Sequence, residues 1–590
     1  MEIYKQSVVQ YQKALDSLKK KYNLISFFRF LSLLAFLVLG YIYFISSQPI
    51  YIILALFALI IFVYFLKLHD KNKYLIHVNN ALVTINQDEI LYLNRIKIPF
   101  ENGIEFNDFN HLYCYDLDIF GENSLFQNVN RTATFIGKKK LSQQLLTLLP
   151  NDAIIKNQTA IEELAMKLSW RHYFLATSKI TKDDKSVYET LLKWSRSEAK
   201  VVSNYYVTIS FVSPILLIGC VIAFFITKNQ TFLNYIPLLF LFNLCMIRNF
   251  LKRIKAEIND AENIDKIIKQ YSLIVQKIET ESFVSDKLID LQQKLFFNKH
   301  LASQQLRRLS LLFSQMDLFF NAMGTIIFNG LFLFHLHVLK QLMFWKQANA
   351  SQLESWLEVI GEFEMLNSLA NLSYNNPDFA YPELNSDFEI SFTNLSHPLL
   401  NSKHRVGNDV VFQPQSFVIL TGSNMSGKST FLRSLGVNMV LAGIGSVVCA
   451  SKASIHPMPI LVSMRLSDSL ADNESYFYAE IKRLKYIMDC LVKRRGFVLL
   501  DEILRGTNSD DKRNGTIEVV KKMLQKRAIG AIATHDIEVC LTTNEYPNEL
   551  TNKCFEAEIV HNDLYFDFKL RNGVCKNRSA SFLMQKMGVI

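Results

Sequence analysis

Charged residues, glycine and proline are all scarce in this sequence. Of its 590 residues, 20% are charged, 20 are Gly and 12 are Pro, whereas 50% are hydrophobic and 45 are Phe. Soluble domains are nearer a quarter charged, so this composition disfavours a chain that is soluble throughout. It also excludes a disordered chain, a collagen-like chain and a small disulfide scaffold. At about 150 residues per domain, the length predicts roughly four structural units.

Neither the cysteines nor the net charge identifies a partner. The 8 cysteines are scattered and none forms a C-x-x-C pair, whereas a zinc site or a disulfide framework needs tighter spacing. We therefore expect reduced, buried thiols in a cytoplasmic body. The 64 Lys and Arg against 54 Asp and Glu give a formal net charge of +10. That mild excess suits nucleic acid and anionic lipid equally well.

Two long apolar regions contain almost no charge: the first has none, and the second has only Lys228, in the loop between its two spans. Ser46–Pro49 divides the first region into spans at about 30–46 and 50–66, and the second holds spans at about 206–226 and 232–247. Each span is near the minimum length that crosses a bilayer core of about 30 Å. Basic residues flank the outer ends of both pairs: Lys19, Lys20, Lys21 and Arg29, Lys67, Lys71 and Lys73, Arg196 and Lys200, and Arg248, Lys252 and Arg253.

By the positive-inside rule, these flanks place both ends of each pair in the cytoplasm. We expect four spans of a lipid bilayer, with both termini in the cytoplasm. We expect this bilayer to be a bacterial inner membrane. The alternative for each pair is a buried helical hairpin of a soluble protein.

A fifth apolar stretch, at 311–344, contains polar residues such as Asp317 and Asn329 that are costly in lipid. We expect a buried amphipathic helix there. His335 and His337 are two residues apart and do not share a helix face, so we interpret them as ordinary polar positions and not as metal ligands. Residues 252–308 mix acids and bases with isoleucines near helical spacing, which predicts a solvated helical arm.

Near Pro382 the pattern changes to short apolar runs separated by Gly and Asn turns, which is typical of an α/β domain. Residues 416–420 predict a buried strand, and a G-x-x-x-x-G-K-[ST] motif follows between that strand and a helix, the context that the motif requires. Its residues are Gly422, Ser423, Asn424, Met425, Ser426, Gly427, Lys428 and Ser429, followed by Thr430. The glycines let backbone N–H groups point at phosphate oxygens. We expect Lys428 to contact the β- and γ-phosphates of a nucleotide and Ser429 to ligate Mg²⁺.

Two more predicted strands end in residues suited to nucleotide hydrolysis. Residues 497–500 run into Asp501 and Glu502. We expect Asp501 to hold Mg²⁺ through water and Glu502 to orient or deprotonate the attacking water. The alternative is a strand followed by a surface acidic pair. A third strand, 529–534, ends at His535, which is expected to contact the γ-phosphate.

These segments resemble the ATPase domain of the MutS mismatch-repair family. The Thr421–Thr430 loop looks like that family's Asn-Met-containing loop, Asp501–Thr507 looks like its acidic strand end followed by Arg-Gly-Thr, and Ala533–His535 looks like its Ala-Thr-His segment. Residues 130–141 and 364–377 are similar to its helical core. The resemblance covers roughly 110–200 and 250–590 and is strong after about 385. It implies an α/β P-loop NTPase domain of the ABC/MutS type, preceded by an all-α core and lever region.

The resemblance also implies roles for two isolated residues. Residues 467–480 are similar to the segment that reaches the partner's ATP, so Ser475 is implied to act across a homodimer, although Asn473 stands where the family usually has Gly. Arg405 stands where an aromatic ring often stacks on adenine, and a planar guanidinium can substitute for it. No mismatch-reading domain fits before residue 110.

The predicted organisation has five regions: 1–74 with the first hairpin, 75–200 with a linker and the start of the core, 201–249 with the second hairpin, 250–385 as helical lever and core, and 386–590 as the ATPase domain. The predicted function is a membrane-anchored ATPase, using ATP and Mg²⁺, that couples a dimer to DNA binding without strong mismatch preference. The alternative is a membrane ATPase that drives a protein assembly through its hairpins, with partners that the sequence does not identify. A transporter is disfavoured because no Leu-Ser-Gly-Gly-Gln signature occurs and the spans lack charged or broken-helix features.

Overall fold

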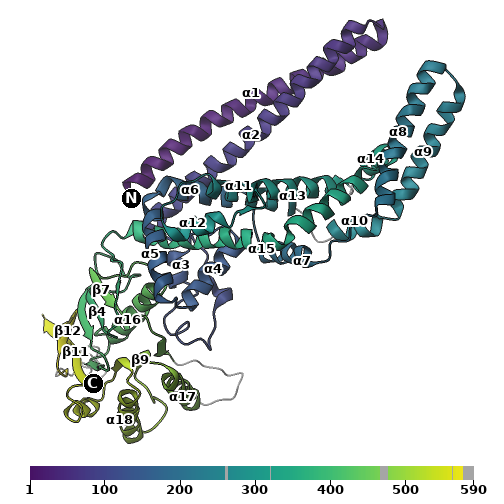
Figure 1. The fold of residues 1–590 in the computed structure, drawn as a ribbon. Helices are drawn as coiled ribbons and strands as arrows, with labels where there is room; N and C mark the ends of the chain where they lie inside the picture. The colour runs from purple at the N-terminus through teal and green to yellow at the C-terminus, as the bar shows by residue number, and fades with distance from the viewer. Residues whose placement is uncertain (259–263, 319–320, 466–475, 561–562, 576–590) are drawn as a thin grey trace.

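The computed structural model describes residues 1–590 except 259–263, 319–320, 466–475, 561–562 and 576–590. The molecule is elongated (Figure 1): two helical hairpins project from a helical body, and an α/β domain lies far from the hairpin tips. Both tips point toward the same side of the molecule.

The first hairpin consists of α1 (Glu2–Ser46) and α2 (Pro49–Leu93), each 45 residues long. Ser47 takes a left-handed conformation in the turn, and Pro49 starts α2, where its missing N–H is not needed. Toward the body the two helices are joined by a hydrogen bond of 2.9 Å from Asn72 Nδ2 to Leu18 O. The predicted helix pair is present, and α2 continues unbroken past residue 74, where the first predicted region ends, into the body.

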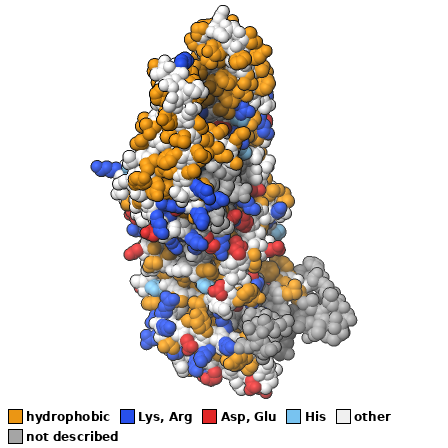
Figure 2. Space-filling view, turned by 90° about the vertical axis from the view of Figure 1, so that its right-hand side faces the viewer, with side chains coloured by type: hydrophobic (Ala, Val, Ile, Leu, Met, Phe, Trp, Pro, Cys, Tyr) orange, Lys and Arg blue, Asp and Glu red, His pale blue; other side chains and the backbone are white. Residues whose placement is uncertain are grey.

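The second hairpin consists of α8 (Asn204–Thr227) and α9 (Gln230–Arg248), joined at Lys228 in a left-handed conformation. Within the described residues, four helices are long and apolar enough to cross a membrane: α1, α2, α8 and α9. A bent pair, α13 (Ala302–Asp317) and α14 (Ala322–Phe332), brings the number to five if it counts as one span. Figure 2 shows hydrophobic side chains gathered over the upper part of the molecule and charged side chains concentrated below. Membrane crossing itself stays a prediction.

The helical body predicted from the sequence is present. Its elements are η1 (Ile104–Phe106), α3 (Leu125–Val129), α4 (Phe135–Leu146), α5 (Asn151–Met166), α6 (Leu168–Ser178), α7 (Lys185–Arg196), α10 (Leu251–Ile258), α11 (Ile264–Glu279), α12 (Asp286–Gln293), β1 (Phe296–Phe297), β2 (His300–Leu301), α13 (Ala302–Asp317) and α15 (Phe334–Asn375). Helix α15 is 42 residues long and buries Trp356 and Phe363 in the centre of the body. Glu89 of α2 is buried against Arg131 and accepts hydrogen bonds from Asn371 and Asn375 of α15. This cluster ties the first hairpin to the body.

The expectation of one buried helix over 311–344 is wrong. Helix α13 ends at Asp317, a separate helix α14 spans Ala322–Phe332, and α15 begins after Leu333, which is left-handed. Asparagine side chains explain the breaks, because they compete with the backbone for hydrogen bonds. The Asn321 side chain caps Gly324 N, and the Asn329 side chain accepts from His335 N. The end of α13 and the start of α15 bury apolar side chains such as Phe313 and Leu339, whereas α14 exposes much of its apolar surface.

The α/β domain contains two sheets. The six-stranded sheet has the order β12-β11-β6-β10-β9-β8, and the four-stranded sheet has the order β3-β7-β4-β5. The strands are β3 (Glu383–Leu384), β4 (Ile390–Leu395), β5 (Asn408–Phe412), β6 (Phe417–Gly422), β7 (Lys452–Ile455), β8 (Ile460–Ser463), β9 (Phe497–Asp501), β10 (Ile529–Ala533), β11 (Leu550–Val560) and β12 (Asp563–Asn572). The helices are α16 (Lys428–Gly443), α17 (Tyr476–Lys493), α18 (Ser509–Gln525) and η3 (Ile537–Asn544).

The three strands predicted to carry the site are confirmed as β6, β9 and β10. They are parallel neighbours, with Ala533 paired to Leu420 on one side and to Asp501 on the other. Every residue in these strands is buried, as expected for the interior of a parallel sheet. Their carboxyl ends therefore lie side by side, where ligands bind in open α/β sheets.

Candidate nucleotide site

The glycine-rich motif forms the connection from β6 to α16. A Cβ atom at Gly422 would lie 2.6 Å from Ser426 Oγ and 2.8 Å from Phe555 O, so no side chain fits there. Gly427 has φ 103° and directly precedes the first residue of α16, a conformation that favours glycine. The loop thus curls tightly against the start of a helix, whose N–H groups and dipole favour an anion.

Lys428 is held inside this loop. Its side chain is nearly buried, and Nζ donates hydrogen bonds of 2.8 Å to Gly422 O and 3.0 Å to Ser423 O. Burial lowers the pKa of the ammonium group, while the charges of Glu502 and Asp501 act to raise it. The ammonium therefore lies where phosphate oxygens cradled by the loop would meet it.

Asp501 and Ser429 lie next to each other beneath the loop. Asp501 is 7% exposed, burial raises the pKa of its carboxyl group, and a hydrogen bond with Ser429 acts in the opposite direction. Asp501 Oδ1 is buried with no hydrogen-bond partner among the described residues, and so are the hydroxyl groups of Ser423 and Ser426. Buried polar atoms are rarely left unpaired. Oxygen donors of this kind fit Mg²⁺, which prefers carboxylate, hydroxyl and phosphate oxygens.

Glu502 and His535 lie within hydrogen-bond distance of each other. His535 Nε2 lies 2.8 Å from Glu502 Oε1 and 3.3 Å from Lys428 Nζ. The hydrogen bond with His535 lowers the pKa of Glu502 to about 2 despite partial burial. Glu502 takes a left-handed conformation with φ 47°, which turns the chain sharply at the end of β9. The three strand ends thus bring together Lys428, Glu502 and His535, as the sequence predicted.

A cavity of about 460 Å³ lies over the loop, within the usual size range of ligand pockets. Its lining includes Asn424–Thr430 and Glu502, together with His397, His404 and Phe568 from outside the motif. Burial lowers the pKa of His397 to about 4. No sequence pattern marks His404 or Phe568 as site residues, because they come from chain segments that only the fold brings to the loop.

Arg405 is not among the residues that line this cavity, although His404 and Val406 are. Its guanidinium forms an ion pair with Asp378 and lies 5.1 Å from the centre of the Phe379 ring. Stacking of Arg405 on adenine stays a prediction, and it requires that guanidinium to leave Asp378.

Ser475, the residue implied to act across a dimer, lies outside the described residues. Glu480, five residues further on in α17, accepts hydrogen bonds from Leu504 N at 2.8 Å and Arg505 N at 3.3 Å. Glu480 therefore fixes the turn that follows the acidic pair Asp501-Glu502.

The helical body contacts the edge of this domain through an acidic loop. Asp116 Oδ1 accepts hydrogen bonds from Met464 N at 2.7 Å and Arg465 N at 2.9 Å, and Asp118 pairs with Arg465 and with Arg433 of α16. The body is thus joined both to the chain just beyond β8 and to the helix that follows the glycine-rich loop.

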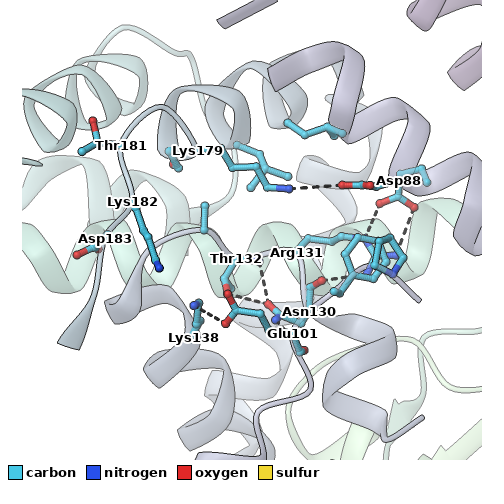
Figure 3. A pocket seen from close by; sticks show the side chains of 17 residues that line it. Asp88, Glu101, Asn130, Arg131, Thr132, Lys138, Lys179, Thr181, Lys182 and Asp183 are labelled. Carbon is cyan, nitrogen blue, oxygen red and sulfur yellow. Dashed lines mark hydrogen bonds and ion pairs between the residues drawn. The ribbon is translucent and has the colours of Figure 1, made fainter. Parts of the chain in front are cut away.

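A second cavity, of about 310 Å³, lies between α2 and α6 (Figure 3). Its acids and bases are largely paired: Lys179 lies 3.8 Å from Asp88, and Lys138 is paired with Glu101. Arg131 is occupied by Glu89. Because its four acids and four bases balance, we assign no ligand to this cavity.

Comparison with known proteins relates the α/β domain to one family. Residues 418–587 match MutS domain V. The chain is 29% identical to MutS protein homolog 4 of Homo sapiens over 233 residues, which are 38% of this chain and 24% of that protein. It is 31% identical to DNA mismatch repair protein MutS of Clostridium perfringens over 232 residues, and 30% identical to that of Thermotoga neapolitana over 227 residues. These matches cover 38% of this chain and 25% and 28% of the two relatives.

The chain thus spans about a quarter of the length of the relatives that it matches. The matches show that the C-terminal region of the chain is similar to MutS domain V, and this region follows a helical region.

Proposed function

We propose, from a C-terminal region similar to MutS domain V, that this protein is a membrane-anchored ATPase of the MutS type. In this proposal a homodimer binds and hydrolyses ATP with Mg²⁺ and couples that cycle to DNA binding without strong mismatch preference. The observation that carries it is the convergence of Lys428, Asp501, Glu502 and His535 at the carboxyl ends of three adjacent parallel strands.

The residues divide the chemistry of hydrolysis among them. The loop N–H groups and Lys428 bind and orient the phosphates, and Ser429 and Asp501 would hold Mg²⁺, which neutralises developing charge on the phosphate oxygens. Glu502 accepts a proton from the water whose oxygen attacks the γ-phosphorus, while the bond to the ADP oxygen breaks. His535, within 2.8 Å of Glu502, positions that carboxylate and is proposed to contact the γ-phosphate.

Membrane anchoring is supported by the two hairpins. Their outer parts present large apolar side chains to the surroundings, such as Phe44, Phe57, Ile215 and Phe225, instead of packing them into the body. Such extended apolar surface is rare on soluble monomers. The α/β domain lies away from both tips, so we place it and both termini on the cytoplasmic side of a bacterial inner membrane.

DNA is proposed as the ligand because the similar proteins are named as DNA mismatch repair proteins. Lys and Arg of the body contact phosphates without reading sequence. Mismatch sensing requires insertion of a wedge side chain at a soft base step, which phosphate contacts do not supply. We therefore expect weak binding that is sensitive to salt.

The test is binding of detergent-solubilised protein to matched and mismatched duplexes across a salt series. The expected result is an affinity that falls steeply with salt and differs between the duplexes by less than about tenfold, or about 1.4 kcal/mol. A larger mismatch preference contradicts the proposal and indicates a direct repair role. Lys299→Arg, an exchange at the body surface that keeps the positive charge, serves as a control and should leave the DNA affinity and its salt dependence unchanged.

A second function is favoured by α15, which joins the end of α14 to the α/β domain in one continuous helix. Such a helix could transmit nucleotide-driven movement to the second hairpin and to a protein partner in the membrane. Absence of DNA binding even at low salt, with ATP hydrolysis intact, would favour this membrane assembly role.

A further inference from the structure

Helix α14 packs against the second hairpin, against both α9 and α8. A Cβ atom at Gly330 would lie only 2.2 Å from the Phe240 ring of α9. A glycine at this contact lets the two helices approach closely, as small residues do between helices in membranes.

A buried asparagine links the three helices. Asn243 of α9 has no exposed surface, and its Nδ2 donates a 2.8 Å hydrogen bond to Gly330 O of α14. Its Oδ1 accepts a 2.5 Å hydrogen bond from Ser213 Oγ of α8. Both ends of the amide are therefore satisfied inside the three-helix group, which is the condition for a polar side chain at membrane depth.

The proline in α8 leaves a backbone carbonyl without its helical partner, and a side chain from the start of α15 takes that place. Pro214 has no N–H to donate to the carbonyl of Ser210, four residues earlier. His337 Nε2, at the start of α15, lies 3.1 Å from that oxygen. Neighbouring helices often satisfy backbone groups that proline frees within membrane helices.

The ends of α14 are also capped internally. Asn321 Oδ1 accepts a 3.0 Å hydrogen bond from Gly324 N, and Leu333 N donates to Asn329 O at 3.0 Å. Asn329 Oδ1 accepts another 3.0 Å bond from His335 N. A short helix leaves unpaired backbone groups at its ends, and these bonds reduce their number.

The opposite face of α14 is apolar and uncovered. Its exposed side chains are Met323, at 76% exposure, with Ile326, Ile327, Phe328 and Phe332. The sequence has no Asp, Glu, Lys or Arg from 318 to 339. Helix α14 packs against α8 and α9, which also expose large apolar side chains such as Ile215 and Leu238, so we expect the three helices to share one environment.

We propose that α14 lies within the lipid of the same bilayer as α8 and α9, as a re-entrant helix in the leaflet nearer the α/β domain. Its 11 residues span about 16 Å, roughly half of a hydrocarbon core of about 30 Å, so it enters and leaves on one side. This inference rests on the proposed membrane placement of the second hairpin. It makes α14 the membrane end of a rigid connection, because α15 follows it and leads to Ala380, which pairs with Val448 of the α/β domain.

The test uses the full-length protein in phosphatidylcholine–phosphatidylglycerol vesicles that contain a phospholipid with a diazirine on its acyl chain. After photolysis, mass spectrometry measures labelling of each segment. We expect residues 322–332 to be labelled as strongly as 215–226 of α8. Both should exceed by several-fold the labelling at Val284, a side chain of the body that is 84% exposed.

The outcomes separate this inference from the proposed function. Labelling of α8 with α14 no higher than Val284 overturns the re-entrant helix and leaves the membrane placement intact. Labelling of neither helix overturns the membrane placement as well.

Two glycine variants test the contact itself. Gly330→Leu forces α14 away from the Phe240 ring, so lipid should reach α9 and its labelling near Phe240 should rise several-fold. In the matched control Gly324→Ala, the added Cβ meets only Asn321 atoms, at an ordinary 3.6 Å, so the pattern should not change. Unchanged labelling near Phe240 in Gly330→Leu contradicts the proposed arrangement.

Discussion

Replacing Glu502 with glutamine tests the central chemical assignment. The amide keeps the size of the side chain and removes the charge that accepts a proton. A positioned general base contributes about 10²–10⁴-fold to a rate, which corresponds to about 3–5 kcal/mol of the barrier. We expect Glu502→Gln to lose turnover by that factor. We also expect it to bind ATP at least as tightly as the parent, because a negative charge lining the cavity is removed.

The pH dependence of the parent follows from the His535 pair. The pKa of Glu502 is lowered from 4.5 to about 2, a preference for the charged form of roughly 3 kcal/mol. Because the folded-state pKa is depressed, this contribution to stability is complete above the unfolded value of 4.5 and is lost as the pH falls through about 2. Any loss of hydrolysis between about pH 6 and 8 must therefore come from another group.

The assay is release of inorganic phosphate at saturating ATP and Mg²⁺, with nucleotide affinity measured separately by a fluorescent ATP analogue. Glu518→Gln, an exposed carboxylate on α18, is the matched control and should keep full turnover. Normal turnover in Glu502→Gln would show that another group is the base. Loss of turnover together with loss of ATP binding would show that Glu502 holds the structure of the site instead.

Three further outcomes are expected. Lys428→Ala should abolish binding of the ATP analogue, whereas Lys526→Ala at the end of α18 should not; retained binding in Lys428→Ala would refute the phosphate contact. ATP should drive Glu502→Gln into a dimer at micromolar concentration, measured by light scattering with the detergent accounted for, and Glu502→Gln/Ser475→Ala should dimerise less; a persistent monomer excludes sites completed across a dimer. Arg131→Met should lower the free energy of unfolding by about 3–5 kcal/mol in a denaturant titration, because it leaves Glu89 buried without its ion-pair partner, and Arg131→Met/Glu89→Met should recover most of that loss.

Local sequence was sufficient for the chemistry of the loop. The glycines, Lys428 and Ser429 act within one strand–loop–helix unit, so their spacing alone predicts their arrangement. The acidic pair and His535 were also predictable, because a polar residue directly after a buried parallel strand must emerge at the sheet edge. The apolar spans were also predictable, because a long run of apolar residues without charge can be recognised from composition alone.

The lengths and breaks of helices were less predictable. Nothing in the charge pattern marks the end of the first hairpin, because α2 continues as an amphipathic helix after its apolar part. The breaks on either side of α14 depend on Asn321 and Asn329. Asparagine side chains cap helices in some settings and are tolerated inside them in others, so their presence in the sequence did not decide between the two.

The sequence by itself determined which residues carry charge and phosphate-binding geometry, and where the chain is apolar enough for lipid. Only the tertiary structure decided that His404 and Phe568 meet over the glycine-rich loop, that Arg405 faces Asp378, and that α14 joins the second hairpin. The physical reason is distance along the chain. A contact between residues some 160 positions apart, such as Asn408 Nδ2 with Phe568 O, depends on strand order and helix packing, which no local pattern of residue types encodes.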